Sequence, residues 1–388
     1  MHLGLDLLFL VPGASGGRET YARELIAAIR EQRDDLRVTA FVNRETAAAG
    51  PGFWTELADR TVVLRAASAL ERRRWALGEL ALLPRAAARE GVEILHSPAN
   101  FAPVHGPFVR VLTLHDLIFR RLPDTVPTPL RWGTEATVPP AARRAHRVIT
   151  ASAASRDDIV AELGIRPERI DVIPHGIAEP PAVSDGAVAR MRHRLGADRR
   201  RIAISVATDV PHKNLGVLLR GLALIASQER PLLVFAGFGT DTGSLPSLAA
   251  ELGVSDDVRL LGAVAPDDLE ALYAQADALV TATLYEGFGL PVLEAMARGV
   301  LVACSGLPVL GEVAGDDAQM FDPHDPASVA SALQRVLAGG DALERRRAAG
   351  RERAARHTWA ASAAQTLRAF DQAAVVARAR RRRGRRGC

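Results

Sequence analysis

Short apolar runs alternate with amphipathic stretches along the first half of the chain. Between the first two runs, apolar side chains of Glu19–Arg30 recur at the spacing of a helix. Such alternation of strands and helices is typical of a parallel sheet with crossover helices. The predicted strands are Leu3–Val11, Arg37–Val42, Ile94–Ser97, Val109–Thr113 and Arg147–Ala151. After the last of these, Ser155 is predicted to cap a helix that runs to Leu163.

The same alternation starts again in the second half. The segment Ile177–Ala187 interrupts it with prolines, a glycine and small polar residues, which indicates a linker between domains. The sequence therefore predicts two doubly wound α/β domains. Because ligands of such sheets bind beyond the carboxyl ends of the strands, we expect the site in a cleft between the domains. The predicted strands of the second half are Arg201–Val206, Leu232–Ala236, Val258–Leu261, Ala278–Ala282 and Leu301–Ala303.

Length and composition agree with a two-domain globular protein. The chain has 388 residues, of which 48% are hydrophobic and 24% charged, enough for two separate cores. Leu7–Val11 is too short to span a bilayer and lacks the flanks of a signal peptide. Cys304 and Cys388 form neither a disulfide framework nor a metal-ligand spacing. These features predict a cytoplasmic protein.

The net charge of +4 comes from one end of the chain. Seven arginines lie between Arg378 and Arg386, so the remainder carries about −3, that is 4 − 7. We expect a disordered tail there. Such a run is usually only a solvated end. Contact with anionic lipid head groups is the functional alternative, and contact with nucleic acid is less expected because no aromatic residues are interleaved. The tail thus suggests peripheral attachment to the inner face of a membrane.

The segment from Glu286 to Glu294 has the composition of a binding loop. Gly287 and Gly289 let backbone amides approach a ligand, and the helix predicted to follow favours an anion at its start. Glu294 is expected in the first turn of that helix. Carboxylates only accept hydrogen bonds, so two beside an anion site suit a polyhydroxylated ligand. The alternative is that Glu294 complements the helix dipole while Glu286 is a solvated loop residue. The presence of both glutamates on either side of the glycine loop favours a ligand-binding site.

The only lysine of the chain, Lys213, lies among 48 arginines. It belongs to Ser205–Asn214, which joins the first strand of the second domain to its helix, where an anion would sit over the helix N-terminus. An ammonium group is a compact charge that can follow a leaving phosphate, whereas a guanidinium prefers a fixed fork. The alternative is an ordinary capping loop that contains a lysine by chance.

Together these segments resemble the family 4 retaining glycosyltransferases, which have the GT-B fold of two facing Rossmann-like domains. The resemblance implies that Glu286 lies by the donor sugar and Glu294 binds the nucleotide ribose. It also implies that the loop backbone holds the sugar and phosphates and that Lys213 neutralises the diphosphate. The loop residues so assigned are Gly287, Phe288, Gly289 and Leu290.

The resemblance extends to the first domain. Thr113–Leu117 is similar to a His-Asp element of the family, which places His115 beside the transferring sugar carbon. Gly16 and Gly17 match a loop that approaches the donor phosphates, although a plain strand-to-helix turn would have the same sequence. One position departs from the pattern. Thr208, expected in the donor site, stands where many members carry an arginine.

The resemblance completes the domain assignment. It implies an N-terminal acceptor-binding domain over residues 1–180 and a C-terminal nucleotide-sugar-binding domain over 181–358. A C-terminal helix over 359–376 is expected to pack back on the N-terminal domain, and the disordered tail covers 377–388. We expect no cofactor and no metal, because the sequence has no Asp-x-Asp pair.

The functional prediction is transfer of a hexose from a nucleoside-diphosphate sugar to a hydroxyl of a glycan, lipid-linked or small-molecule acceptor. The relatives so resembled include bacterial mannosyl- and rhamnosyltransferases that build envelope polysaccharides. Two alternatives stay open: a nucleotide-sugar epimerase, which shares the architecture, and a non-catalytic scaffold, suggested by Thr208. Gly237–Gly243 hints at a dinucleotide fingerprint, but its third glycine comes one position late.

Overall fold

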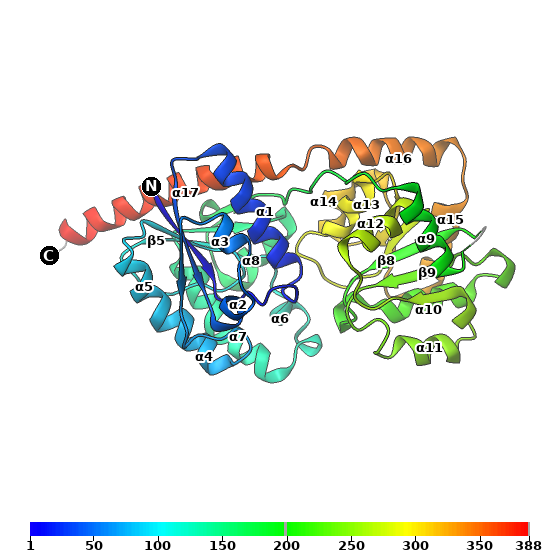
Figure 1. Ribbon diagram of the computed structural model, residues 1–388, viewed down its shortest axis with the longest axis horizontal. Helices are drawn as coiled ribbons and strands as arrows, with labels where there is room; N and C mark the ends of the chain where they lie inside the picture. Colours follow the sequence, from blue (N-terminus) through cyan, green and yellow to red (C-terminus); the bar gives the residue numbers. More distant parts are fainter. Residues whose placement is uncertain (198–199, 387–388) are drawn as a thin grey trace. The chain divides into compact units, whose positions relative to one another are not determined.

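The computed structural model describes residues 1–197 and 200–386, with the side chains of 379–386 outside the description. The chain divides into two compact units, which we describe separately (Figure 1). Unit 1 comprises Met1–Gly176 and the chain from Thr358 onward, and unit 2 comprises Ile177–His357.

Unit 1 is built on a parallel sheet, seven-stranded in the described residues, in the order β3-β2-β1-β4-β5-β6-β7. Its central strands are buried on both faces, as expected when crossover helices cover a parallel sheet. The two edge strands, β3 and β7, were not predicted from the sequence, because each is short and contains polar residues. The strands are β1 (His2–Leu7), β2 (Arg37–Val42), β3 (Arg60–Val63), β4 (Ile94–Ser97), β5 (Val109–Thr113), β6 (Arg147–Thr150) and β7 (Ile170–Val172).

The first strand is shorter than predicted. It ends at Leu7 rather than Val11, because the buried side-chain amide of Asn43 donates hydrogen bonds to the carbonyls of Leu8 and Leu10, at 2.9 and 2.8 Å. Those carbonyls are therefore satisfied without a neighbouring strand.

Helices pack on both faces of this sheet. The helical segments are α1 (Gly17–Gln32), α2 (Arg44–Ala48), α3 (Phe53–Glu56), α4 (Arg72–Leu77), η1 (Gly78–Leu82), α5 (Leu83–Arg89), α6 (Ile118–Arg121), η2 (Pro123–Thr125), α7 (Thr128–Arg144), α8 (Ala153–Leu163), η3 (Pro167–Arg169) and α17 (Trp359–Arg386). The N-cap of α8 is Ser152 and not Ser155, since the Ser152 hydroxyl accepts the backbone N–H of Ser155 at 3.0 Å.

The last helix, α17, packs against α1, so the two ends of the chain share one core. Ala363 and Phe370 of α17 are fully buried in the cluster that holds Leu25 and Ile29 of α1. The backbone of α17 is helical as far as Arg386. Residues 387 and 388 of the Arg-rich tail lie outside the described residues, as do the side chains from residue 379 onward.

Unit 2 repeats the architecture with its own core and a parallel sheet, six-stranded where the structure describes it, in the order β10-β9-β8-β11-β12-β13. Its strands are β8 (Ile202–Val206), β9 (Leu232–Ala236), β10 (Val258–Leu260), β11 (Ala278–Thr281), β12 (Leu301–Ser305) and β13 (Gln319–Phe321). Its helical segments are α9 (Asp185–Leu195), η4 (Pro211–Lys213), α10 (Leu215–Leu224), η5 (Ser227–Glu229), α11 (Leu245–Glu251), η6 (Ser255–Asp257), α12 (Pro266–Gln275), α13 (Leu290–Ala297), α14 (Pro308–Ala314), η7 (Gly315–Asp317), α15 (Pro326–Leu337) and α16 (Asp341–Ala354).

A buried pair of acidic side chains lies beside a π-helical turn in unit 1. Glu79, on the π-helix η1, and Asp6, on β1, are 3% and 2% exposed. Asp6 accepts a hydrogen bond from the Ser97 hydroxyl at 2.8 Å, while Oε2 of Glu79 has no partner among the described residues. Burial raises the pKa of Asp6 to about 6 and the pKa of Glu79 well above its ordinary value. The pair therefore holds protons at a pH where exposed carboxyls have lost them.

From the raised pKa values of Asp6 and Glu79 we expect the protein to become less stable as the pH rises. Because the folded state binds more protons than the unfolded state between the ordinary carboxyl pKa and about 6, the free energy of unfolding should decrease across that range. Glu79→Gln gives Asp6 a neutral amide neighbour without the cost of keeping a buried carboxyl protonated, so it should stabilise unit 1 above pH 7. Denaturant titrations at pH 4 and pH 7.5 measure this. The gain should vanish at pH 4, and exposed Glu31→Gln should show no gain at either pH.

Candidate functional site

Three loops of unit 2 emerge from neighbouring strands at the carboxyl edge of its sheet. The strands β9, β8 and β11 are adjacent and parallel, so the loops after them lie side by side. The loop after β8 contains exposed Thr208 and ends in the 3₁₀ turn η4. Asn214, with φ of 52°, then caps α10 and donates its side-chain amide to the carbonyl of Pro323 at 2.8 Å. These contacts fix the backbone that carries Lys213.

Lys213 and Glu286 form an ion pair, so the structure brings two of the predicted site residues together. The loops that carry them are joined directly, since the backbone N–H of Leu284 donates to the carbonyl of His212 at 2.7 Å. The Lys213 and Glu286 side chains are 22% and 18% exposed, so both charges stay accessible from solvent. The pair places a cation and an acceptor-only anion at one point of the sheet edge.

The loop after Glu286 is held by its aromatic residue and shaped by its second glycine. Phe288 is buried, and its ring centroid lies 6.1 Å from that of His357. Gly289 has φ of 106° and is the N-cap of α13, and a β-carbon added there would lie 2.6 Å from Leu310 Cδ2. The positive φ therefore favours glycine at this position, and a larger residue would also have to displace the end of the Leu310 side chain. Gly287 and Leu290, on either side, are half-buried.

Glu294 lies in the second turn of α13, one turn later than predicted. The helix begins at Leu290 because Gly289 adopts the left-handed conformation, which makes Glu294 the fifth helical residue. Its Oε2 accepts the hydroxyl of Tyr273 at 3.1 Å, and Oε1 has no hydrogen bond within the described part of the chain. Among those residues Glu294 forms no hydrogen bond or ion pair with Lys213 or Glu286. One carboxylate oxygen is thus left to accept from a ligand.

Glu294 is supported by residues that the sequence analysis missed. Arg298 lies over the Tyr273 ring at 4.8 Å from its centroid and forms an ion pair with Glu270. Burial raises the pKa of Glu294 and raises that of Tyr273 well above its ordinary value. Tyr273 and Glu270 lie on α12, and no spacing in the sequence connects that helix with α13.

In unit 1, the predicted glycine loop begins the first helix. Gly16, with φ of 57°, is the N-cap of α1, and Gly17 is the first helical residue. Both are exposed. The Glu19 carboxylate accepts the backbone N–H of Gly13 at 3.0 Å, which ties the loop back onto the helix.

His115 is held in one tautomer at the end of β5. Its Nε2 donates to the carbonyl of Pro98 at 2.7 Å, and its backbone N–H donates to Oδ1 of Asn100 at 2.6 Å. Burial lowers the pKa of His115, so the imidazole is neutral at pH 7 and its Nδ1 is the acceptor. Asn100 adopts φ of 67°, which a short polar residue tolerates and which no sequence pattern revealed.

Aromatic rings far apart in the sequence surround His115. Its ring centroid lies 4.9 Å from that of Tyr21 and 5.4 Å from that of His175, and His175 stacks on Trp359. The Tyr21 hydroxyl contacts the Thr113 hydroxyl at 3.0 Å. Burial lowers the pKa of His175 well below its ordinary value. The cluster is thus uncharged, and it keeps the His115 ring from turning.

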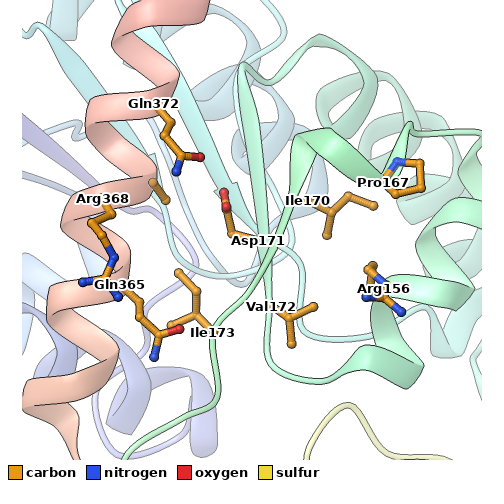
Figure 2. A pocket seen from close by; sticks show the side chains of 10 residues that line it. Arg156, Pro167, Ile170, Asp171, Val172, Ile173, Gln365, Arg368 and Gln372 are labelled. Carbon is orange, nitrogen blue, oxygen red and sulfur yellow. The ribbon is translucent and has the colours of Figure 1, made fainter.

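A separate hollow in unit 1 has a volume of about 370 Å³ and lies between β7, α8 and α17 (Figure 2). Asp171 comes from the edge strand, Arg156 from α8, and Arg368 from α17. None of the predicted site residues lines it.

Among the described residues, no group of three or more His, Cys, Asp or Glu side chains is placed to hold a metal ion. Nor does any described helix have the length and apolar character needed to cross a bilayer.

Comparison with known sequences identifies the family. The profile of group 1 glycosyl transferases matches residues 189–353, and that of glycosyltransferase family 4 matches residues 15–179. The O-antigen chain mannosyltransferase B of Escherichia coli is 30% identical over 71% of this chain and 74% of that protein. The chain belongs to glycosyltransferase family 4.

Other relatives of this family 4 chain match over a smaller share of their length. The MMP alpha-(1->4)-mannosyltransferase of Mycolicibacterium hassiacum is 32% identical over 60% of this chain and 55% of that protein. The chain thus spans between about half and three-quarters of these two relatives.

Solved structures confirm the predicted GT-B fold, with a Rossmann-like domain in each half. The structure of Anabaena HepE in complex with UDP-glucose superimposes with a TM-score of 0.74 at 20% identity, covering 95% of this chain and 99% of that one. The arrangement of the donor site across the two units remains a prediction for this family 4 chain.

Proposed function

We propose that the protein transfers a hexose from a nucleoside-diphosphate sugar to an acceptor hydroxyl, with retention of configuration at the anomeric carbon. The Lys213–Glu286 ion pair beside the Gly287–Gly289 loop carries this proposal. It places a compact cation for a diphosphate and a carboxylate for sugar hydroxyls on one sheet edge. The names of the mannosyltransferase relatives and the UDP-glucose bound to HepE support a hexose donor.

In the proposed reaction, the bond from the anomeric carbon to the diphosphate oxygen breaks as the bond to the acceptor oxygen forms on the same face. The acceptor proton passes to an oxygen of the leaving diphosphate. Lys213 neutralises the charge that builds there, which is electrostatic stabilisation by a preorganised cation rather than by a metal ion. Glu286 holds the sugar, and Glu294 binds the ribose through Oε1.

We assign the remaining predicted residues to the same donor. Thr208, Gly16 and Gly17 would line the phosphates, and the neutral His115 would accept a sugar hydroxyl at Nδ1. The support is the fixed tautomer of His115 and the exposed glycine loop at the start of α1. The proposed partners are a glycan or lipid-linked acceptor and, for the Arg-rich tail, an anionic membrane surface on the cytoplasmic side.

Nucleotide-dependent thermal shifts test the proposal. Wild-type protein should be stabilised by one nucleoside diphosphate among GDP, UDP and TDP and by its sugar conjugates, because a ligand that binds only the folded state raises the melting temperature. NAD should give no shift. The Lys213→Ala variant should show a smaller shift with the same nucleotide. Absence of a shift with every nucleotide would support a scaffold without donor binding, with Thr208 in place of arginine as its first explanation.

A further inference from the structure

The loop after β9 presents an aromatic ring to solvent. Phe238 lies between Gly237, with φ of 154°, and Gly239, with φ of 84°, and its side chain is 75% exposed. It makes no ring contact with any described residue. Phenylalanine is usually covered in folded proteins, so such exposure on a loop indicates a surface that something else covers.

The backbone beneath this ring is rigid. Thr240, fully buried, donates its hydroxyl to the carbonyl of Gly237 at 2.9 Å and accepts the N–H of Gly262 at 3.1 Å. The N–H of Gly237 donates to the carbonyl of Gly262 at 2.8 Å. The exposure of Phe238 is therefore imposed by a fixed loop. A ligand that stacked on the ring would meet it already oriented.

The same loop adjoins the loop that carries Lys213. The backbone N–H of Asp209 donates to the carbonyl of Phe238 at 2.9 Å, and a β-carbon on Gly237 would collide with the carbonyl of Ala207. Asp209 and Lys213 lie on one loop, and Lys213 is paired with Glu286 on the next strand. Strands β9 and β11 flank β8 at about 4.8 Å each. The strand that leads into the Phe238 loop thus lies about two strand spacings, or about 10 Å, from the strand that leads into the Glu286 loop.

We propose that Phe238 is the stacking platform for the nucleobase of the donor, which rests on the proposed donor site. With the diphosphate at Lys213, a nucleoside extended along the sheet edge brings its base to the loop after β9. Every base has a π-face, so stacking on phenylalanine increases affinity for nucleosides of each kind. Phe238 would then set how tightly the nucleotide binds, while the choice of base falls to hydrogen-bonding groups elsewhere.

Calorimetric titration of the full chain with the preferred nucleoside diphosphate and with pyrophosphate tests this assignment. Phe238→Ala should weaken the nucleoside diphosphate roughly tenfold and leave pyrophosphate unchanged, because only the former has a base to stack. Phe238→Trp should retain the affinity, and its indole fluorescence should be quenched on binding. The matched control is Trp132→Ala, which removes a ring that is 67% exposed in unit 1 and should change neither affinity.

The outcomes separate the two proposals. If wild-type protein binds no nucleotide, the proposed function fails. If wild type binds and Phe238→Ala binds equally well, only the stacking assignment fails. Equal weakening of nucleotide and pyrophosphate would also overturn it, because the ring would then act on the phosphate loop. An unchanged melting temperature of Phe238→Ala, expected for so exposed a side chain, shows that the fold is intact.

Discussion

Replacing Lys213 by alanine should lower kcat by roughly 10²–10³-fold, the usual effect of removing one preorganised group that stabilises charge in the transition state. The diphosphate gains charge as it leaves, and Lys213 is the cation that the structure pairs with Glu286 at the site edge. The effect on KM for the donor should be smaller, since in the proposed site the ground-state diphosphate is also held by the loop backbone. Steady-state kinetics with the donor identified by thermal shift measures both constants.

Two further variants give this prediction its controls. Lys213→Arg keeps the charge but replaces the compact ammonium with a planar fork, so it should recover only part of the rate. Arg220→Ala removes an exposed cation from α10, close in sequence, and should leave kcat unchanged. Wild-type kcat in Lys213→Ala would remove Lys213 from the mechanism.

Replacing Glu294 by alanine should weaken donor binding by roughly 10–100-fold, because a hydrogen bond from a ribose hydroxyl to a carboxylate contributes about 1.5–3 kcal/mol. Affinity for pyrophosphate, which has no ribose, should stay the same. Burial raises the pKa of Glu294, so donor affinity should decline on acidification at a higher pH than an exposed glutamate would cause. Calorimetric titrations across pH measure all three effects.

The Glu294 prediction also needs a test of folding. Glu294 accepts from the buried Tyr273, so alanine leaves that hydroxyl without its partner and lowers stability. Glu294→Gln preserves the shape and that hydrogen bond, and should weaken donor binding by an intermediate amount. The exposed Glu251→Ala is the matched control. If Glu294→Gln binds the donor as tightly as wild type, the ribose assignment is wrong.

The sequence predicted the central strands well because buried parallel strands are near-continuous apolar runs. The edge strands β3 and β7 lack that pattern, since one side of each faces solvent. Glu294 was predicted in the first turn of α13, but the left-handed conformation of Gly289 starts the helix at Leu290 and so places Glu294 in the second turn. The sequence pattern therefore predicts that a helix or strand exists better than it predicts the residue at which it begins.

For the candidate site, the sequence supplied Lys213, Glu286 and the glycine loop, because each stands in a recognisable short segment. It did not supply Tyr273 behind Glu294 or Trp359 behind His175, since those contacts join residues far apart in the chain. Phe238 was visible only as part of a poor dinucleotide fingerprint. The exposure of its ring, on which the proposed stacking role rests, is a property of the folded loop.

The placement of α17 has a consequence for biosynthesis. The chain enters unit 2 at Ile177, returns to unit 1 at Thr358, and only then supplies Trp359, Ala363 and Phe370 to the core around α1. On the ribosome, unit 2 is complete before unit 1. The apolar face of α1 therefore stays uncovered until α17 has been synthesised, and a chain released before residue 358 would leave that face open for chaperones or proteases to bind.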